Sequence, residues 1–158
     1  MARWRCILLF VTMVLPSCGN SQTAPSPTQA SIVAALSPNP LVSTVCAPSP
    51  CQASDGRLFR WQIQGTLLIE ETAGVGGTVS SITVTAFNPQ IVYTADYIVR
   101  NAGTNRVAAR GMLLIPITGL YGLVDNASAS KSVLLPFVVA FTDDRGNSLT
   151  ALASWTVN

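Results

Sequence analysis

Along much of the chain, hydrophobic and polar residues alternate with a period of two. Between Phe59 and Ile69 the odd-numbered positions are apolar or glycine, whereas the even-numbered ones are mostly polar. Successive side chains of a β-strand point to opposite faces of the sheet, so this pattern predicts a half-buried strand. The glycine-rich run 74–77 (GVGG) predicts a turn, and a second alternating stretch over residues 81–86 predicts the next strand.

The C-terminal region gives the clearest hairpin pattern. Residues 133–142 and 149–157 alternate in the same way, and the turn-forming run 143–147 (DDRGN) separates them. We expect no helix, because no long stretch has apolar residues at helical spacing. Weaker patterns predict further strands at residues 32–36, 41–45, 91–99, 106–115 and 119–124.

Seven to eight short strands separated by turn signals predict an all-β fold, an antiparallel β-sandwich. A small β-barrel is the alternative. The final hairpin, FVVAFTDDRGNSLTALASWTV, resembles the closing strands of immunoglobulin-like and fibronectin-like modules of bacterial surface proteins. The resemblance implies an Ig-like sandwich over residues 30–158. The cross-sheet disulfide of antibody domains is missing, because Cys46 and Cys51 both precede the first long strand.

The first 18 residues, MARWRCILLFVTMVLPSC, combine a positively charged start with a short apolar core. Arg3 and Arg5 supply the charge. The apolar core spans about ten residues, roughly half the length that a permanent membrane span needs. This organisation is typical of a cleaved secretory signal. The segment ends in Leu15-Pro16-Ser17-Cys18, which resembles the lipobox of bacterial lipoproteins.

The resemblance implies that residues 1–17 are a lipoprotein signal peptide and that Cys18 is the lipidation site. In that family the cysteine receives a diacylglyceryl group, the chain is cleaved before it, and the new N-terminus is acylated. Each buried methylene contributes about 0.8 kcal/mol, so several acyl chains hold a protein firmly on a lipid bilayer. Pro16 departs from the small residues common at its position. An ordinary secretory signal and an uncleaved anchor are the alternatives.

Residues 18–29 are expected to form the lipidated cysteine and a flexible tether. The run GNSQTAPSPTQ has no charge and no aromatic residue, so it cannot bury an apolar face. Fully extended at about 3.1 Å per residue, it reaches about 34 Å. Gly19 follows the cysteine, as in lipoproteins that Gram-negative bacteria send to the outer membrane. The expected location is therefore the cell envelope, anchored to a membrane outside the cytoplasm.

Charge is sparse, at 10% of the 158 residues, and the chain contains no histidine. Removing Arg3 and Arg5 from the nine basic residues leaves seven, which equals the number of acidic ones. A neutral chain lacks the basic surface that phosphate backbones require, so nucleic acid is not expected as a partner. Without histidine, the commonest general base and metal ligand is missing. We therefore expect a protein that is not an enzyme and uses no cofactor or metal.

Cys46 and Cys51 are expected to form a disulfide that closes a short loop, because the chain is expected outside the cytoplasm. Loop entropy gives such a bond about 2 kcal/mol, and less where Pro48 and Pro50 already stiffen the unfolded loop. A redox pair is the weaker interpretation, since redox motifs favour two intervening residues. A zinc site would need further thiol or imidazole ligands.

Three other groups of residues suggest chemistry only weakly. Asp143, Asp144 and Asn147 could hold Ca²⁺, although such residues recur in hairpin turns for conformational reasons. Glu70 and Glu71 cannot form a catalytic pair, because neighbours on a strand point to opposite faces. Asp96 lies between two tyrosines that are expected to pack, and the triplet 126–128 (NAS) matches a glycosylation site that is idle in a bacterial lipoprotein.

Two functions are consistent with these features. The first is a non-catalytic binding or structural module of the cell envelope, whose partner is another envelope protein or a polysaccharide. Trp61 and Trp155 are predicted to point inward, which favours protein over sugar. The second is a carrier or receptor for a small apolar ligand, suggested by the run 112–124 (MLLIPITGLYGLV). A barrel could hold such a ligand, whereas a sandwich has no cavity for it.

Overall fold

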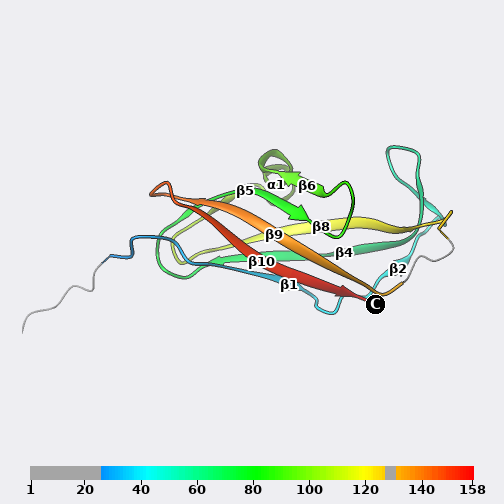
Figure 1. Cartoon of the computed structure of the whole chain (residues 1–158), viewed down its shortest axis with the longest axis horizontal. Coiled ribbons are helices and arrows are strands. Elements are labelled where there is room, and N and C mark those ends of the chain that lie inside the picture. Colours follow the sequence, from blue (N-terminus) through cyan, green and yellow to red (C-terminus); the bar gives the residue numbers. More distant parts are fainter. Residues whose placement is uncertain (1–25, 127–130) are drawn as a thin grey trace, which may run out of the picture.

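A computed structural model describes residues 26–126 and 131–158, and it consists of two facing antiparallel sheets (Figure 1). The first, here the β4 sheet, contains β1 (Ile32–Ser37), β2 (Thr44–Val45), β3 (Cys51–Gln52), β4 (Leu58–Glu71) and β8 (Met112–Leu123). The second, here the β9 sheet, contains β5 (Gly77–Val84), β6 (Ile91–Thr94), β7 (Arg106–Val107), β9 (Val133–Asp143) and β10 (Ser148–Val157).

This arrangement confirms the predicted two-sheet antiparallel fold. The sheets of the described residues do not close into a barrel, so the alternative fold was wrong. The described part has ten strands, more than the seven to eight predicted, and three of them (β2, β3 and β7) are pairings of only two residues each.

Strand β4 is the centre of its sheet, and its alternation is the predicted one. Ile63, Leu67 and Ile69 are buried on the inner face, at the odd-numbered positions. Along one edge β4 pairs with β1, β2 and β3, and along the other it pairs with β8 over almost its whole length. The inner residues of β4 and β8 therefore lie opposite one another, as Leu67 does with Ile115.

Strand β8 replaces two of the predicted strands. The patterns at 106–115 and 119–124 predicted a break near Pro116, but β8 runs through this proline without interruption. The reason is its place in the sheet: β8 is an edge strand, where proline is tolerated because one side of the backbone has no strand to pair with. Only Arg106 and Val107, the two residues of β7, form a separate strand, and they belong to the other sheet.

The β9–β10 hairpin follows the sequence prediction closely. Thr142 pairs with Ser148 and Val133 with Val157, so the register is continuous through ten residue pairs. Four hydrophobic residues of β9 are buried at alternating positions, Leu135, Phe137, Val139 and Phe141, and Asp143 continues the series. On β10, Trp155 is fully buried.

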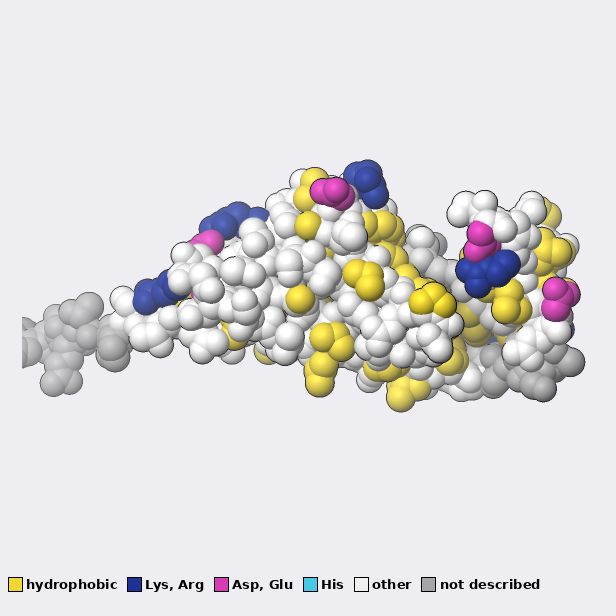
Figure 2. All heavy atoms as spheres, turned by 45° about the horizontal axis from the view of Figure 1, so that its top comes forward, with side chains coloured by type: hydrophobic (Ala, Val, Ile, Leu, Met, Phe, Trp, Pro, Cys, Tyr) yellow, Lys and Arg dark blue, Asp and Glu magenta, His cyan; other side chains and the backbone are white. Residues whose placement is uncertain are grey.

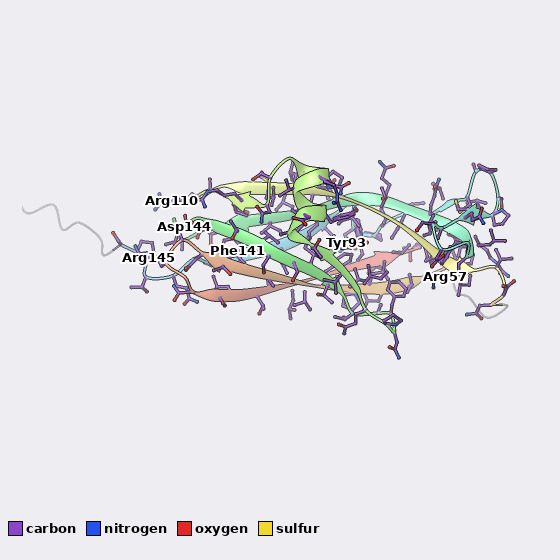
Figure 3. The ribbon with its side chains drawn as sticks, turned by 90° about the horizontal axis from the view of Figure 1, so that it is seen from above. Arg57, Tyr93, Arg110, Phe141, Asp144 and Arg145 are labelled. Atoms are coloured by element: carbon purple, nitrogen blue, oxygen red, sulfur yellow. A yellow bond between two sulfur atoms is a disulfide. The ribbon has the colours of Figure 1, made fainter. Side chains whose placement is uncertain are left out.

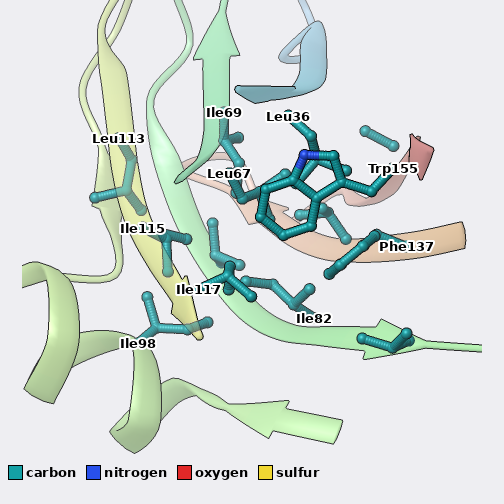
Figure 4. Close-up of a cluster of buried hydrophobic side chains, with 14 of the residues drawn as sticks. Leu36, Leu67, Ile69, Ile82, Ile98, Leu113, Ile115, Ile117, Phe137 and Trp155 are labelled. Carbon is teal, nitrogen blue, oxygen red and sulfur yellow. The ribbon is translucent and has the colours of Figure 1, made fainter. Parts of the chain in front are cut away.

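Trp155 is at the centre of the core between the two sheets (Figure 4). Its ring meets Phe137 edge-on, with 5.7 Å between the centroids. Its indole Nε1 donates a 2.7 Å hydrogen bond to the Pro38 carbonyl, which satisfies the polar atom that burial would otherwise leave unpaired. The ring lies against Gly65 of β4, where a Cβ would overlap it. Gly65 is therefore needed for the close approach of the sheets.

The segment 38–43 connects the sheets along one side. Leu41 donates a hydrogen bond to the Thr156 carbonyl and accepts one from Asn158, while Ser43 donates to the Asn158 carbonyl. The predicted strand 41–45 is thus divided: its first part pairs with the β9 sheet, and only Thr44–Val45 joins the β4 sheet as β2.

The opposite side of the sandwich is covered by α1 (Ala95–Ala102), where the sequence analysis predicted no helix and a strand over 91–99. Only the first part of that strand forms, as β6. The Thr94 hydroxyl accepts from the Tyr97 amide at the start of α1, and Gly103 ends it in the left-handed conformation. Ile98 of α1 is fully buried, and its side chain lies beside the inner residues of β8 (Figure 4).

Candidate functional site

The described chain enters the domain at one end of the long axis (Figure 1). Cys18 and the tether up to residue 25 lie outside the described residues, so the predicted lipidation site has no structural description. Residues 26–29 are exposed, and Ala30 is the first buried residue of the described part.

Two buried carboxylates hold this entry point. Ala30 donates its amide to Asp143 Oδ2 at 3.0 Å, and Ser31 donates to Glu71 Oε1 at 3.2 Å. Asp143 belongs to the β9 sheet and Glu71 to the β4 sheet. Adjacent backbone amides are thus bound to different sheets, which fixes the backbone of residues 30–31 between them.

The sequence pattern did not lead us to expect that Glu71 is a buried structural residue. It is 1% exposed, and besides Ser31 it accepts the amides of Ala73, Gly74 and Arg110 at 2.8–2.9 Å. Burial raises the pKa of this carboxyl, but the four amide donors outweigh burial and lower the pKa to about 2. The signal was present in the sequence, because Glu71 continues the odd-numbered, inward series of β4.

The acidic turn at 143–147 has its own structural role. Asp143 accepts hydrogen bonds from the amides of Arg145 and Asn147 and from the Asn147 side chain at 2.8–3.0 Å. Asp144 forms a bidentate ion pair with Arg106 at 2.7–2.9 Å. Both carboxylates therefore face N–H donors rather than one another, and the described residues contain no cluster of three or more metal-ligating side chains.

The remaining candidates occupy separate places. Cys46 and Cys51 are joined by a disulfide with 5.2 Å between their Cα atoms, as the sequence predicts. Glu70 is exposed on the face opposite Glu71, in agreement with the argument against a catalytic pair. Asp96 is in the first turn of α1, and its neighbours Tyr93 and Tyr97 pack with 4.6 Å between ring centroids. Of the triplet 126–128, the last two residues lie outside the described part.

A concave surface lies at the end of the sandwich far from the chain entry. It is a groove of about 1160 Å³ between two projecting loops, 52–57 and 87–91, with β4 and β8 as its floor. Figure 2 shows the surface hollowed between the main body and the lobe on the right. Figure 3 places Arg57 at this end and Asp144 and Arg145 at the opposite one. We call it the distal groove.

The floor of the distal groove is fixed by aromatic packing. Trp61 of β4 and Tyr121 of β8 pair across the sheet, with 5.4 Å between their ring centroids. Gly122 has a φ of 71°, and a Cβ there would overlap the Trp61 ring. Tyr121 also donates its hydroxyl to the Lys131 carbonyl at 2.9 Å. Six consecutive residues of β8, 118–123, line the groove.

Next to the distal groove is a partly open apolar space of about 60 Å³, lined among others by Ile63, Phe87 and Tyr93. An engineered cavity that takes up benzene measures about 150 Å³. This space is therefore smaller than a small apolar ligand needs, and it does not favour the carrier function.

No family model matches the sequence, and no curated protein matches it. Among the described residues, the single helix is too short to cross a membrane.

Proposed function

We propose that this chain is a lipid-anchored, extracytoplasmic lipoprotein whose Ig-like sandwich acts as a non-catalytic binding module of the cell envelope. Cys18 would attach it to the bilayer of a membrane outside the cytoplasm, the outer membrane in a Gram-negative bacterium. The facing antiparallel sheets and the β9–β10 hairpin support the Ig-like form.

One observation carries the proposal: the chain entry is at one end of the long axis (Figure 1), and Arg57, which lines the distal groove, is at the other (Figure 3). A domain tethered at Ala30 presents the far end to its surroundings. Asp143 and Glu71 hold the backbone of residues 30–31 at the entry, because they bind adjacent amides from two sheets. The groove would then face away from the membrane, where another envelope protein or a polysaccharide can reach it.

The anchor is tested by labelling bacteria that express the full chain with radioactive palmitate and separating membrane from soluble fractions. We expect label on the wild type and none on Cys18→Ser, which should leave the detergent fraction. Cys6→Ser is the matched control, because it removes the other leader cysteine and should retain label and membrane attachment. Unlabelled wild-type protein, or Cys18→Ser protein that stays equally firmly in the membrane, would contradict the anchor.

A further inference from the structure

Strand β8 leaves one edge of the β4 sheet without a neighbouring strand. It pairs with β4 on one side, and among the described residues no strand pairs with it on the other. Helix α1 lies beside the middle of β8, where Ile98 is close to Ile115 and Ile117 (Figure 4). Further along the strand, residues 118–123 line the distal groove. The free edge of β8 is therefore open where the strand enters the groove.

The backbone of this open stretch has hydrogen-bonding groups to offer. In an antiparallel pair, alternate residues bond to the neighbouring strand, and the residues between them direct N–H and C=O away from it. The Glu71 amide donates to the Gly111 carbonyl just before β8, so the odd-numbered residues that follow face β4. Pro116, which has no N–H, is accordingly at an even-numbered position. The backbone groups of Thr118 and Leu120 thus point away from β4, and no other described segment bonds to them.

The two faces beside this edge differ in chemistry. Thr118 lies opposite Gln64 on the outer face of the sheet, whereas Gly119 lies opposite Ile63 on the inner face. A strand added to the edge would direct alternate side chains to these two faces. Of the described residues that line the groove, only Arg57 is charged, and it is already in an ion pair. The edge therefore suits an uncharged segment in which polar and apolar residues alternate.

The inner face has room for one side chain beside Gly119. Glycine contributes no side chain there, and the apolar space of about 60 Å³ is lined by Gly119 together with Ile63, Phe87 and Ile91. The same residues also line the distal groove, so the space is continuous with it. It is too small for a free apolar ligand. A residue of an added strand opposite Gly119 would direct its side chain into this space, because opposite residues of neighbouring strands share a face.

An extended peptide from another protein fits these features better than a second copy of the chain. Loops 52–57 and 87–91 project on the two sides of the groove, so a single strand can enter where the edge of a second folded sheet would meet the loops. The tether of a second copy, GNSQTAPSPTQ, has two prolines and no alternating apolar residues. In strand addition, backbone hydrogen bonds supply affinity and sites for alternate side chains supply specificity.

We infer that the free edge of β8 at residues 118–123 binds an extended, uncharged segment of another envelope protein as an added β-strand. A small apolar side chain of that segment would lie opposite Gly119, between the two sheets. The inference rests on the proposed function and specifies the partner as a protein strand instead of a polysaccharide.

The test uses the full chain extracted from membranes and fluorescent heptapeptides in which threonine alternates with alanine, valine or leucine. Fluorescence anisotropy measures their binding. We expect saturable binding of at least one alternating peptide, and no binding of peptides with the same composition in scrambled order. N-methylation of alternate residues then identifies strand addition. Methyl groups on one set of alternate amides should abolish binding, because those amides face β8, whereas methyl groups on the other set should leave it unchanged.

Variants of the protein test the same contact from the other side. Leu120→Pro removes one outward N–H and places a proline at the free edge, as Pro116 does earlier in β8. It should weaken peptide binding at least about fivefold, the factor that one neutral hydrogen bond supplies. Leu120→Ala is the matched control, because it removes the side chain and keeps the N–H. Gly119→Ala places a methyl group towards the apolar space and should also weaken binding, whereas Gln64→Ala on the outer face should not.

Three outcomes would overturn the inference: no binding of any alternating peptide, equal binding of alternating and scrambled peptides, or equal effects of the two N-methylated sets. Binding to a folded Leu120→Pro protein that matches binding to Leu120→Ala would also overturn it. None of these outcomes depends on the lipid. A protein that carries palmitate but fails with the peptides would retain the proposed anchor and lose this partner.

Discussion

The carboxylate of Asp143 accepts the amide of Ala30, 113 residues away in the chain, at 3.0 Å. Asp143 is at the end of β9 and also binds the turn that follows it. Ala30 is the first buried residue of the described part of the chain. One buried side chain therefore determines both the geometry of the last hairpin and the point where the chain enters the domain.

The stability of the domain should depend on the ionisation of Glu71 and Asp143. Both carboxyl groups are desolvated by burial, yet their amide donors lower each pKa to about 2, from ordinary values of 4.5 and 3.8. Since the folded pKa is the lower one, the stabilisation is complete above about pH 4.5 and is lost as the pH falls towards 2. Urea unfolding midpoints between pH 7 and pH 2 should decrease over this range.

Glu71→Gln isolates one of these groups. At pH 7 it should destabilise the domain by about 1–3 kcal/mol, because an amide cannot replace a carboxylate that accepts four N–H groups. The difference from wild type should shrink towards pH 2. Glu70→Gln, on the exposed face, should stay within about 0.5 kcal/mol of wild type. A difference between Glu71→Gln and wild type that is independent of pH would contradict this account.

Gly65→Ala should destabilise the domain, because its Cβ would overlap the ring of the buried Trp155. Overpacking of this kind costs about 1–3 kcal/mol. The control is Gly119→Ala on β8, where the added Cβ would lie 3.3 Å from the Ile63 side chain and meet no ring. Chemical denaturation of both variants gives the comparison, and equal stability would show that the sheets can separate at Gly65 without cost.

Helix α1, which the sequence pattern did not predict, gives a further test. Ile98→Ala should cost about 2–5 kcal/mol, because Ile98 is fully buried. Val99→Ala, one residue later and 42% exposed, should cost much less. If the segment were a strand, as the sequence pattern predicted, Ile98 and Val99 would still point to opposite faces. Amide hydrogen exchange distinguishes a helix from a strand here. In the helix, the Gly103 amide donates a hydrogen bond to the Val99 carbonyl, so we expect it to exchange slowly.

The sequence pattern predicted a strand well where one face is buried and the other is in contact with solvent, because apolar and polar residues then alternate. The alternation on β4 and the β9–β10 hairpin are examples, because each has one buried and one solvated face. Helix α1 was missed because eight residues are too few for a helical period, although Thr94 and Gly103 stand at its two caps. The capping residues were the usable signal.

The distal groove could not be predicted in the same way. Its lining comes from segments that are far apart in the chain: the loop 52–57, β4, the loop 87–91 and β8. Only the strand register and the two projecting loops bring them together. A pattern along the chain records which face a residue occupies, but it does not record which strand ends lie side by side.

The disulfide should make a small contribution to stability. Replacing both Cys46 and Cys51 by serine should cost at most about 2 kcal/mol, the loop-entropy value for so short a ring. Melting of the double variant measures this. In the oxidised wild type, an alkylating reagent used without reductant should add no mass at these two positions. Modification of both thiols would show that the bond is absent.

The claim that the distal groove is the contact surface of an envelope-anchored module is tested most directly by crosslinking in intact cells. A benzophenone amino acid replaces Gln52 in one strain and Gln29 in another, and each strain is irradiated before the full chain is extracted. We expect crosslinked adducts of higher mass from position 52 and few from position 29. Adducts from position 29 alone, or equal adducts from both positions, would contradict the account.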